Sequence, residues 1–364
     1  MADTKLFQPI KLGRLSLQHR VVMAPLTRLR VDEDHVPLPN VVEHYTQRSS
    51  TPGTLLIAEA CSVSPSHCGG KHMPGIWSQA QIKGWRKVTD AVHGKGCFIY
   101  CQLFAPGRAM NKEGYPLYSS SAVPMVPDGP IPQEITEEEI WACIDDFKAA
   151  AKNAIAAGFD GIELHGANGY LIDQFTQDTC NKRTDAWGGS VEKRSKFALE
   201  VTKAVVDAIG GDRVGVRFSP WSTFQSMKMD VPLAEEQFSH IIRNLKPLQL
   251  SYLHLIESRV INNVDCEKKE GLEFAYKIWQ NQSPILVAGG FNPKKAKKAV
   301  DEEYDDDTLV VFGRYFVSTP DLVFRLQKGL EMNPYDRSTF YTPVQSEGYT
   351  DYPFSEEFLQ TASA

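Results

Sequence analysis

Three side chains with complementary chemistry follow a short apolar run, and they suggest a site that acts on a carbonyl compound. Residues 158–164 are expected to form a buried strand, and His165, Asn168 and Tyr170 come where that strand ends. His165 and Asn168 can both donate hydrogen bonds to one carbonyl oxygen, while Tyr170 carries a weakly acidic proton. Together they could polarise a carbonyl and protonate its neighbouring carbon. The spacing H-x-x-N-x-Y alone is common by chance, so its surroundings must support it.

The elements that position these side chains are expected to be repeated β–α units. Eight short apolar runs lie at residues 20–26, 53–60, 97–104, 161–166, 213–219, 252–257, 285–291 and 309–316. Segments of helical periodicity between them include 136–157, 191–209, 233–245, 272–280, 294–302 and 320–330. This alternation predicts an α/β fold with parallel strands, and eight of them favour a closed (β/α)8 TIM barrel. An open doubly wound sheet is the competing fold, but no G-x-G-x-x-G motif supports it.

Three segments stand outside the repeat of what is predicted to be one domain, residues 1–364. Residues 7–18 alternate around Gly13 and are expected to form a β-hairpin at the barrel floor. Residues 107–132, rich in Pro, Ser, Gly and Tyr, form an insertion after the third strand and should cap the active-site end. Residues 333–364 form a C-terminal tail that is aromatic but lacks clear periodicity.

An arginine inside the fifth apolar run predicts an anion in the barrel. Val214, Val216 and Phe218 face one side of that strand, so Arg217 faces the other. A guanidinium stays protonated, and burying it unpaired is very costly. Its partner is either a buried carboxylate such as Glu163 or negative charge on a cofactor or reaction intermediate.

Glycines after the seventh and eighth strands indicate a phosphorylated ligand. Gly289 and Gly290 follow one strand, and Gly313 precedes Arg314 after the next. Glycine permits close backbone approach, barrels often bind phosphate through these loops, and arginine suits bidentate phosphate binding. Tight turns and a surface arginine are the alternative for either segment alone.

Composition and charge narrow the function classes. A net charge of -6 disfavours nucleic acid or an anionic membrane as a partner. Neither a secretory signal nor a run of about 18 apolar residues is visible, so a cytoplasmic protein is expected. The seven scattered cysteines lack a metal spacing and indicate a reducing compartment, with no disulfide framework and no bound metal.

These segments together resemble the Old Yellow Enzyme family of FMN-dependent ene-reductases, in the branch typified by the yeast enzymes. The resemblance extends from Leu6 to about Tyr352. The matching segments, in the family's order, are residues 24–28, 102–103 with 107–108, 165–175, 183–185 with 187–190, 217–220, 288–291 and 312–314. The resemblance implies a (β/α)8 barrel that holds one non-covalent FMN, with NADPH as hydride donor.

The resemblance also implies a role for each matching residue. The isoalloxazine ring would contact Pro25, Thr27, Ala60, Gln102 and Arg217. The FMN phosphate would be held by Gly289, Gly290, Gly313 and Arg314. His165 and Asn168 would bind the substrate's carbonyl oxygen, and Tyr170 would donate the proton. The substrate pocket would be lined by Phe224, Phe340 and Tyr341.

The implied reaction is reduction of the C=C bond of an α,β-unsaturated carbonyl compound, by ping-pong hydride transfer from NADPH through flavin N5. A biosynthetic reductase or isomerase of a specialised enone or enal is the second hypothesis. The intact Tyr170 favours reduction, because such branches can differ at the proton donor. A barrel that binds a phosphorylated ligand without redox chemistry is the third. The physiological substrate, the stereochemical outcome and the choice between monomer and homodimer stay open.

Overall fold

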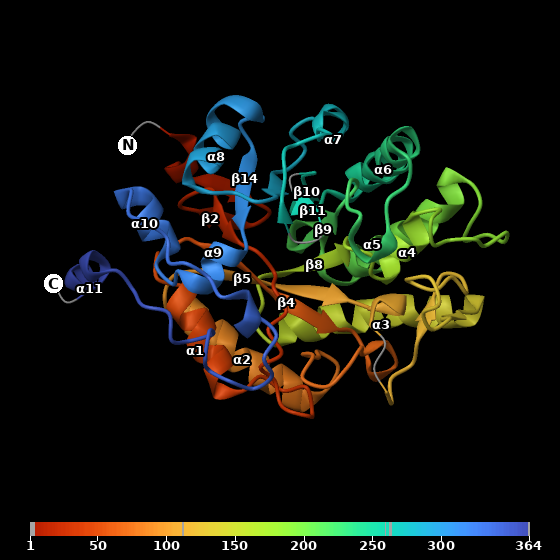
Figure 1. Cartoon of the computed structure of the whole chain (residues 1–364), viewed down its shortest axis with the longest axis horizontal. Coiled ribbons are helices and arrows are strands. Elements are labelled where there is room, and N and C mark those ends of the chain that lie inside the picture. Colours follow the sequence, from red (N-terminus) through yellow and green to blue (C-terminus); the bar gives the residue numbers. More distant parts are fainter. Residues whose placement is uncertain (1–3, 111–112, 259, 262–263, 363–364) are drawn as a thin grey trace.

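The centre of the protein is a closed β-barrel, seen in a computed structural model that describes residues 4–110, 113–258, 260–261 and 264–362 (Figure 1). Within these residues, eight parallel strands pair in the order β10-β13-β14-β3-β4-β5-β8-β9 and close on themselves. They are β3 (Val21–Met23), β4 (Leu55–Ser62), β5 (Phe98–Phe104), β8 (Gly161–Gly166), β9 (Val214–Phe218), β10 (Tyr252–Ile256), β13 (Ile285–Ala288) and β14 (Thr308–Phe312). The predicted barrel is therefore confirmed, and the open doubly wound sheet is wrong.

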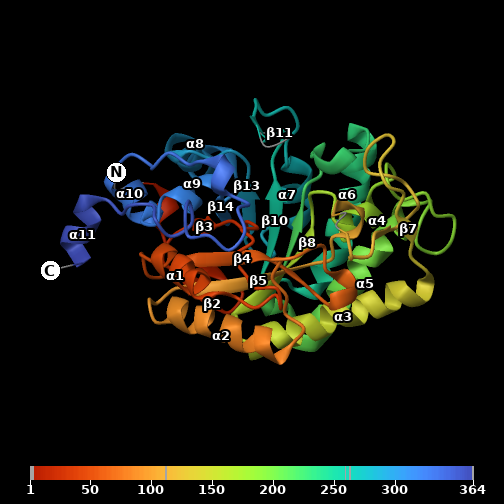
Figure 2. The same ribbon diagram turned by 60° about the horizontal axis from the view of Figure 1, so that its bottom comes forward.

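Helices surround the barrel, and Figures 1 and 2 show α2 and α3 running along one side of it. They are α1 (Pro39–Arg48), α2 (Gln79–His93), α3 (Glu137–Ala156), α4 (Leu171–Thr176), α5 (Val191–Ile209), α6 (Val231–Leu245), α7 (Glu273–Trp279), α8 (Pro293–Lys298), α9 (Arg314–Ser318), α10 (Leu322–Lys328) and α11 (Glu356–Ala362). Hydrogen bonds from nearby side chains fix where several of these helices begin. Before α3, for example, the Thr136 hydroxyl accepts from Glu139 N–H at 3.2 Å while Thr136 N–H donates to Glu139 Oε2 at 2.7 Å.

Several predicted elements were placed too broadly: the runs 20–26 and 285–291, for example, are strand only at Val21–Met23 and Ile285–Ala288. The expected run 309–316 is strand only as far as Phe312, because Gly313 turns the chain and α9 begins at Arg314. Its apolar continuation packs as a helix, which periodicity cannot distinguish from a strand over so few residues. The expected helix 294–302 ends at Lys298 and passes into a π-helical turn, η7 (Ala299–Glu303).

A β-hairpin closes one end of the barrel. It consists of β1 (Ile10–Leu12) and β2 (Leu15–Leu17), which pair antiparallel. Its leucines pack in one buried cluster with Tyr100, Tyr252 and other side chains from inside the barrel. The predicted hairpin at the floor is confirmed, and the opposite end, where the strands reach their carboxyl ends, is where barrel active sites form.

Long segments follow some of the strands at the carboxyl end of the barrel. The 107–132 insertion contains η3 (Gly107–Ala109) and β6 (Tyr118–Ser119), which pairs with β7 (Gln133–Glu134). The two further strands are β11 (Val260–Ile261) and β12 (Val264–Asp265). The C-terminal tail contains η8 (Arg337–Thr339) before α11, which lies at the far edge of the molecule beyond α10 (Figure 1).

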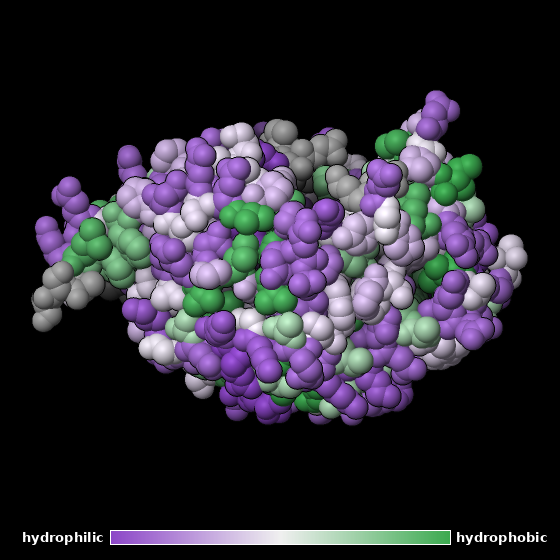
Figure 3. All heavy atoms as spheres, turned by 90° about the horizontal axis from the view of Figure 1, so that it is seen from below, coloured by the Kyte–Doolittle hydropathy of each residue, from purple (hydrophilic) through white to green (hydrophobic). Residues whose placement is uncertain are grey.

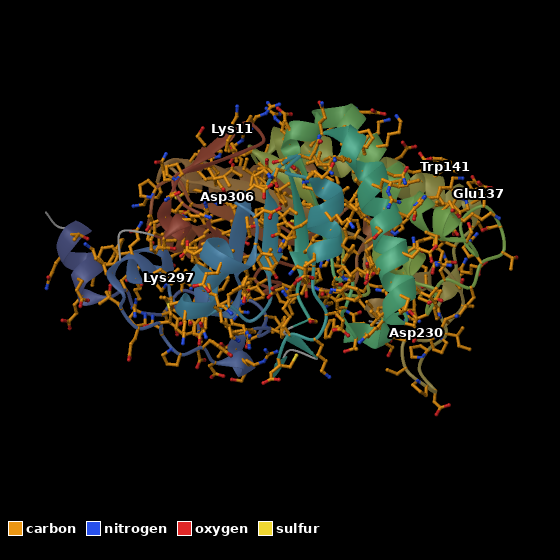
Figure 4. All side chains as sticks on the ribbon, turned by 90° about the horizontal axis from the view of Figure 1, so that it is seen from above. Lys11, Glu137, Trp141, Asp230, Lys297 and Asp306 are labelled. Atoms are coloured by element: carbon orange, nitrogen blue, oxygen red, sulfur yellow. The ribbon has the colours of Figure 1, made fainter. Side chains whose placement is uncertain are left out.

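The outer surface is largely hydrophilic. Lys11, Asp230 and Asp306 are exposed, and Figure 4 shows them in different parts of the molecule. On the face shown in Figure 3, apolar residues gather near the middle of a mainly hydrophilic surface. In the described part of the chain, no helix is both long enough and apolar enough to cross a membrane.

Candidate active site

One cavity of about 530 Å³ opens at the carboxyl ends of the strands and brings every predicted site residue together. Its lining includes all fifteen of them: Pro25, Thr27, Ala60, Gln102, His165, Asn168, Tyr170, Arg217, Phe224, Gly289, Gly290, Gly313, Arg314, Phe340 and Tyr341. These residues come from seven barrel strands or the loops after them, from η5 (Phe224–Ser226) and from the C-terminal tail. A shared cavity is the arrangement that their predicted roles require.

Strand order divides the cavity into two regions. β13, β14 and β3 are neighbours, and the loops after them bring Gly290, Arg314 and Thr27 close together. β5, β8 and β9 are also neighbours and carry Gln102, His165 and Arg217. In the second group, His165 pairs in register with Arg217. The predicted phosphate-binding and carbonyl-binding residues therefore approach one cavity from different parts of the barrel wall.

His165 is a neutral hydrogen-bond donor toward the cavity. Burial lowers the pKa of His165 well below its usual value, and the positive charge of Arg217 lowers it further. Its Nδ1 accepts the Ala167 backbone N–H at 3.3 Å, so the single ring proton is assigned to Nε2. A neutral imidazole with this tautomer can donate to a carbonyl oxygen.

The turn that carries Asn168 is fixed from several sides. Asn168 has a φ of 58°, a conformation that asparagine tolerates, and its N–H donates to Ser219 Oγ at 2.8 Å. Gly169 follows with a φ of 76°, and its N–H donates to Asp173 Oδ2 at 2.8 Å. The Gly169 carbonyl accepts from Gln174 Nε2 at 2.7 Å. The buried side chains of α4 thus set the direction in which this loop presents its amide.

Tyr170 is held beside His165 in an apolar surrounding. The two ring centroids lie 4.7 Å apart, and Phe104 meets the phenol ring edge-on at 5.2 Å. Burial raises the pKa of Tyr170 to about 12. The phenol therefore keeps its proton across the neutral range, as a proton donor must.

Arg217 reaches the cavity without the salt bridge that was the alternative explanation for its burial. The Glu163 carboxylate instead accepts hydrogen bonds from Gln102 Nε2 at 2.7 Å, Tyr252 Oη at 3.0 Å and His254 Nδ1 at 2.7 Å. Arg217 Nε is buried with no hydrogen-bond partner among the described residues. A buried cation without such a partner favours binding of an anionic or electron-rich ligand in the cavity.

The charge of the cavity also suits a phosphorylated cofactor. Three arginines line it, Arg217, Arg314 and Arg337, and no Asp or Glu is among the described lining residues. Arg314 donates to Tyr335 Oη at 3.1 Å and stacks on that ring. A Cβ on Gly313 would have its nearest neighbour 3.7 Å away, so the backbone there faces space that a ligand could use. These features fit FMN, with its phosphate at the end of the cavity that is lined by Gly313 and Arg314.

Two buried arginines were not assigned a role from the sequence, although they hold a wall of the cavity. Arg28 Nε donates to the Phe340 carbonyl at 3.0 Å and its Nη2 to Gly348 at 2.8 Å. Arg30 donates to the carbonyls of Phe340 at 3.0 Å and Thr339 at 2.9 Å. The only sequence signal was a pair of arginines directly after the first strand, because backbone carbonyl partners leave no trace in residue types.

Further lining residues that were not predicted include Leu29, Met73, Met110, Ile256, Phe291 and Arg337. Most are apolar loop residues, which sequence patterns do not distinguish from other loop positions.

Comparison with known proteins identifies the family. A family model described as "NADH:flavin oxidoreductase / NADH oxidase family" matches residues 5–333. The crystal structure of Old Yellow Enzyme from Pichia sp. AKU4542 superposes with a TM-score of 0.90 at 37% identity, covering 98% of this chain and 95% of that one. The chain belongs to the Old Yellow Enzyme family. The resemblance noted in the sequence is confirmed, and the tail residues Phe340 and Tyr341 lie beyond the matched family segment.

Other Old Yellow Enzyme relatives differ in what their names say about activity. "Chanoclavine-I aldehyde reductase fgaOx3" of Penicillium roqueforti is 52% identical over 99% of both chains. "Probable inactive reductase easA" of Epichloe festucae var. lolii is 49% identical over 99% of this chain and 97% of its own. Family membership makes this protein an oxidoreductase by descent.

Proposed function

We propose that this Old Yellow Enzyme relative uses FMN and NADPH to reduce the C=C bond of α,β-unsaturated carbonyl compounds. The observation that carries the proposal is one cavity that gathers a neutral His165, the Asn168 amide and a protonated Tyr170. Two donors and one acid are what an enone needs in order to accept a hydride and a proton on adjacent carbons.

The cofactor would be held by two groups of residues. Pro25, Thr27, Ala60, Gln102 and Arg217 would contact the isoalloxazine ring. Gly289, Gly290, Gly313 and Arg314 would bind the phosphate. The unpartnered Nε of Arg217 and the absence of carboxylates from the described lining support this assignment. Bound FMN would supply the hydride chemistry, taking a hydride from NADPH and passing one to the substrate.

The substrate's carbonyl oxygen would accept hydrogen bonds from His165 Nε2 and the Asn168 amide. These donors draw electron density from the β-carbon, which makes it the acceptor of the hydride, and they stabilise the negative charge that then develops on oxygen. Fixed donors serve this purpose well because they need no reorganisation during the reaction. Tyr170 would complete the reduction by protonating the α-carbon.

The remainder of the substrate would rest against Phe224, Phe340 and Tyr341. Phe340 is 3% exposed, whereas Tyr341 is 54% exposed at the cavity wall. A buried aromatic next to an accessible one suits a substrate with an apolar body that enters past Tyr341. The enone or enal would therefore be an apolar small molecule.

A second candidate is a biosynthetic reductase or isomerase of one specialised enone or enal. The similarity to the fungal chanoclavine-I aldehyde reductase favours it. The two candidates share the cavity and the role of Tyr170, and they differ in substrate breadth and in whether reducing equivalents are consumed.

The test is a stoichiometric turnover assay on purified, FMN-loaded protein with a panel of simple enones and enals. The proposal predicts one saturated product for each NADPH oxidised, and faster reaction with NADPH than with NADH. Product formed without net NADPH consumption would instead support the isomerase. A protein that retains FMN but reduces no member of the panel would belong with the inactive relatives, and one that retains no flavin would refute the proposal.

A further inference from the structure

A network of buried polar side chains lies beneath the cavity, inside the barrel. Its centre is Glu163 on β8, which is fully buried and does not line the cavity. Gln102 of β5, Tyr252 of β10 and His254 of β10 all donate to its carboxylate, at distances of 2.7, 3.0 and 2.7 Å. Only Gln102 among these four lines the cavity. Glu163 can therefore act on the cavity only through its neighbours.

The strand register builds this network. Gln102 pairs with Glu163, Glu163 pairs with Gly215, and Gly215 pairs with Tyr252. A Cβ on Gly215 would lie 2.2 Å from the Tyr252 ring carbon Cζ. Because Gly215 of β9 has no side chain, the Tyr252 phenol has room to pass across β9 and reach the Glu163 carboxylate. Four neighbouring strands contribute to one buried anion.

Glu163 determines which way the Gln102 amide faces. An ionised carboxylate has only acceptors, so the amide group that contacts it must be the NH2 donor. The Glu163 pKa is lowered by His254, Arg217 and Gln102 despite its burial, which keeps the carboxylate ionised. With Nε2 committed to Glu163 at 2.7 Å, Oε1 is the group that Gln102 has left for the cavity.

Glu163 also determines how much positive charge the cavity experiences. Its charge is the first among the interactions that raise the pKa of Arg217 against the lowering caused by burial. Arg217 lines the cavity and Glu163 lies behind it, so the two charges partly cancel for anything bound there. His254 contributes a hydrogen bond, since its pKa is lowered by burial and it donates from Nδ1 as a neutral ring.

We propose that Glu163 is a positioning residue for the cofactor, which orients the Gln102 amide with its oxygen toward the flavin and partly offsets the charge of Arg217. The carboxylate thereby sets the balance between binding of oxidised and of reduced FMN. This inference rests on the FMN site proposed above, but it concerns a residue that touches neither cofactor nor substrate.

The test is Glu163→Gln, which keeps the side-chain size and removes the charge. Arg217 is then left without its compensating anion, and a cation favours the more electron-rich, reduced flavin. The ratio of reduced to oxidised FMN affinity should rise about tenfold, which for a two-electron couple is about 30 mV more positive. The measurement is the midpoint potential of the FMN-loaded protein, by anaerobic titration against a reference dye.

Tyr252→Phe is the matched control. It deletes one hydrogen bond to the same carboxylate and leaves the charge in place, so the midpoint potential should stay at the wild-type value. A wild-type potential in Glu163→Gln, or an equal shift in both variants, would overturn the inference. Failure of the wild-type protein to bind FMN would refute the proposed function instead.

A second measurement needs no substitution and applies if Glu163→Gln does not fold. An amide oxygen directed at the cavity can accept only from a ring N–H, and oxidised flavin has one at N3. FMN methylated at N3 should therefore bind the wild-type protein at least about tenfold more weakly than FMN, the effect of losing one buried hydrogen bond. Equal affinity for the two flavins would overturn the proposed orientation of Gln102.

Discussion

At the scale of single residues, burial sets the protonation states that the proposed chemistry needs. The pKa of His165 is lowered and that of Tyr170 is raised to about 12, and desolvation is the largest cause of both shifts. The same low-polarity surrounding therefore gives a neutral donor and a protonated acid without any titration near pH 7. Sequence spacing identified these residues, whereas their ionisation follows from the burial seen in the fold.

Replacing Tyr170 with Phe should separate the two halves of the reaction. Reduction of the bound flavin by NADPH should keep its wild-type rate, because it needs no proton donor on the substrate side. Reoxidation by cyclohexenone should slow about 100-fold or more, the usual contribution of a positioned general acid. Anaerobic stopped-flow absorbance resolves the two rates.

Tyr115→Phe is the matched control for that experiment. Tyr115 packs in the same apolar cluster as Tyr170 but does not line the cavity, so losing its hydroxyl should change neither rate. Rapid reoxidation of Tyr170→Phe, equal to the wild type, would show that another group supplies the proton.

The pH profile gives an independent check on Tyr170. A phenol donates only in its protonated form, and with a pKa of about 12 that form is lost only as the pH rises toward 12. The reoxidation rate should therefore stay flat from about pH 7 to 10, where an ordinary tyrosine of pKa ~10 would already be half ionised. Single-turnover reoxidation measured across this range tests whether the pKa of Tyr170 is raised. A loss of rate with a midpoint near pH 10 would show that burial does not raise it.

At the scale of elements, loops far apart in the sequence fix one another around the cavity. Two guanidiniums lie over the Tyr349 ring, with Arg28 Cζ 5.0 Å and Arg30 Cζ 4.9 Å from its centroid. Its other neighbour is the His44 ring of α1, stacked at 4.0 Å. The tail that carries Phe340 and Tyr341 is thus fastened to the loop after β3, close to Thr27.

Replacing Arg30 with Lys should loosen the tail without emptying the FMN site. Arg30 donates to five backbone carbonyls, those of Arg28, Thr339, Phe340, Gln345 and Glu347. A single ammonium cannot reproduce this planar fork, so we expect a loss of ~1–3 kcal/mol of local stability. Limited proteolysis within residues 339–349 should accelerate, and the KM for a bulky enone should rise more than the Kd of FMN.

Arg14→Lys is the control for that substitution. Arg14 pairs with Asp212 at an exposed site at 2.5 Å, where an ion pair contributes little. Its proteolysis pattern and KM should match the wild type. If Arg30→Lys also behaves like the wild type, the guanidinium contacts do not hold the tail.

The capping box of α3 offers a prediction that concerns stability alone. Thr136→Ala removes the hydroxyl that accepts Glu139 N–H and should cost ~1 kcal/mol, while Thr136→Ser should retain most of it. The urea midpoint of unfolding measures both variants. Neither should change turnover, because the cap is outside the cavity lining. An unshifted midpoint for Thr136→Ala would indicate that this helix start is already unfolded or redundant.

At the scale of the whole molecule, the alternation of apolar runs and helical periods was enough to predict the barrel, the hairpin floor and the end that carries the site. That succeeds because parallel strands bring their carboxyl ends to one rim, wherever they lie in the sequence. The role of Glu163 could not be predicted in the same way, nor could the hydrogen bonds from Arg28 and Arg30 to the C-terminal tail. They depend on strand register and on backbone carbonyls, which residue types do not report.

The barrel as a whole also explains how one cavity gathers the residues proposed to bind the cofactor and those proposed to bind the substrate. The barrel closes because β9 pairs with β10 and β14 pairs with β3. Closure brings the loops that carry Gly290 and Arg314 to the same rim as His165 at the end of β8. The floor is filled by the hairpin leucines, and helices surround the wall of the barrel. At the rim, the insertion and the tail both contribute lining residues to the cavity, Met110 and Tyr341 among them.

The most direct test of the central claim is an anaerobic single-turnover experiment on the purified wild-type protein. The claim predicts a yellow protein whose flavin absorbance is bleached by one equivalent of NADPH and restored by one equivalent of cyclohexenone, with cyclohexanone as the product. A colourless protein that takes up no FMN, or bleached flavin that no enone or enal restores, would contradict it.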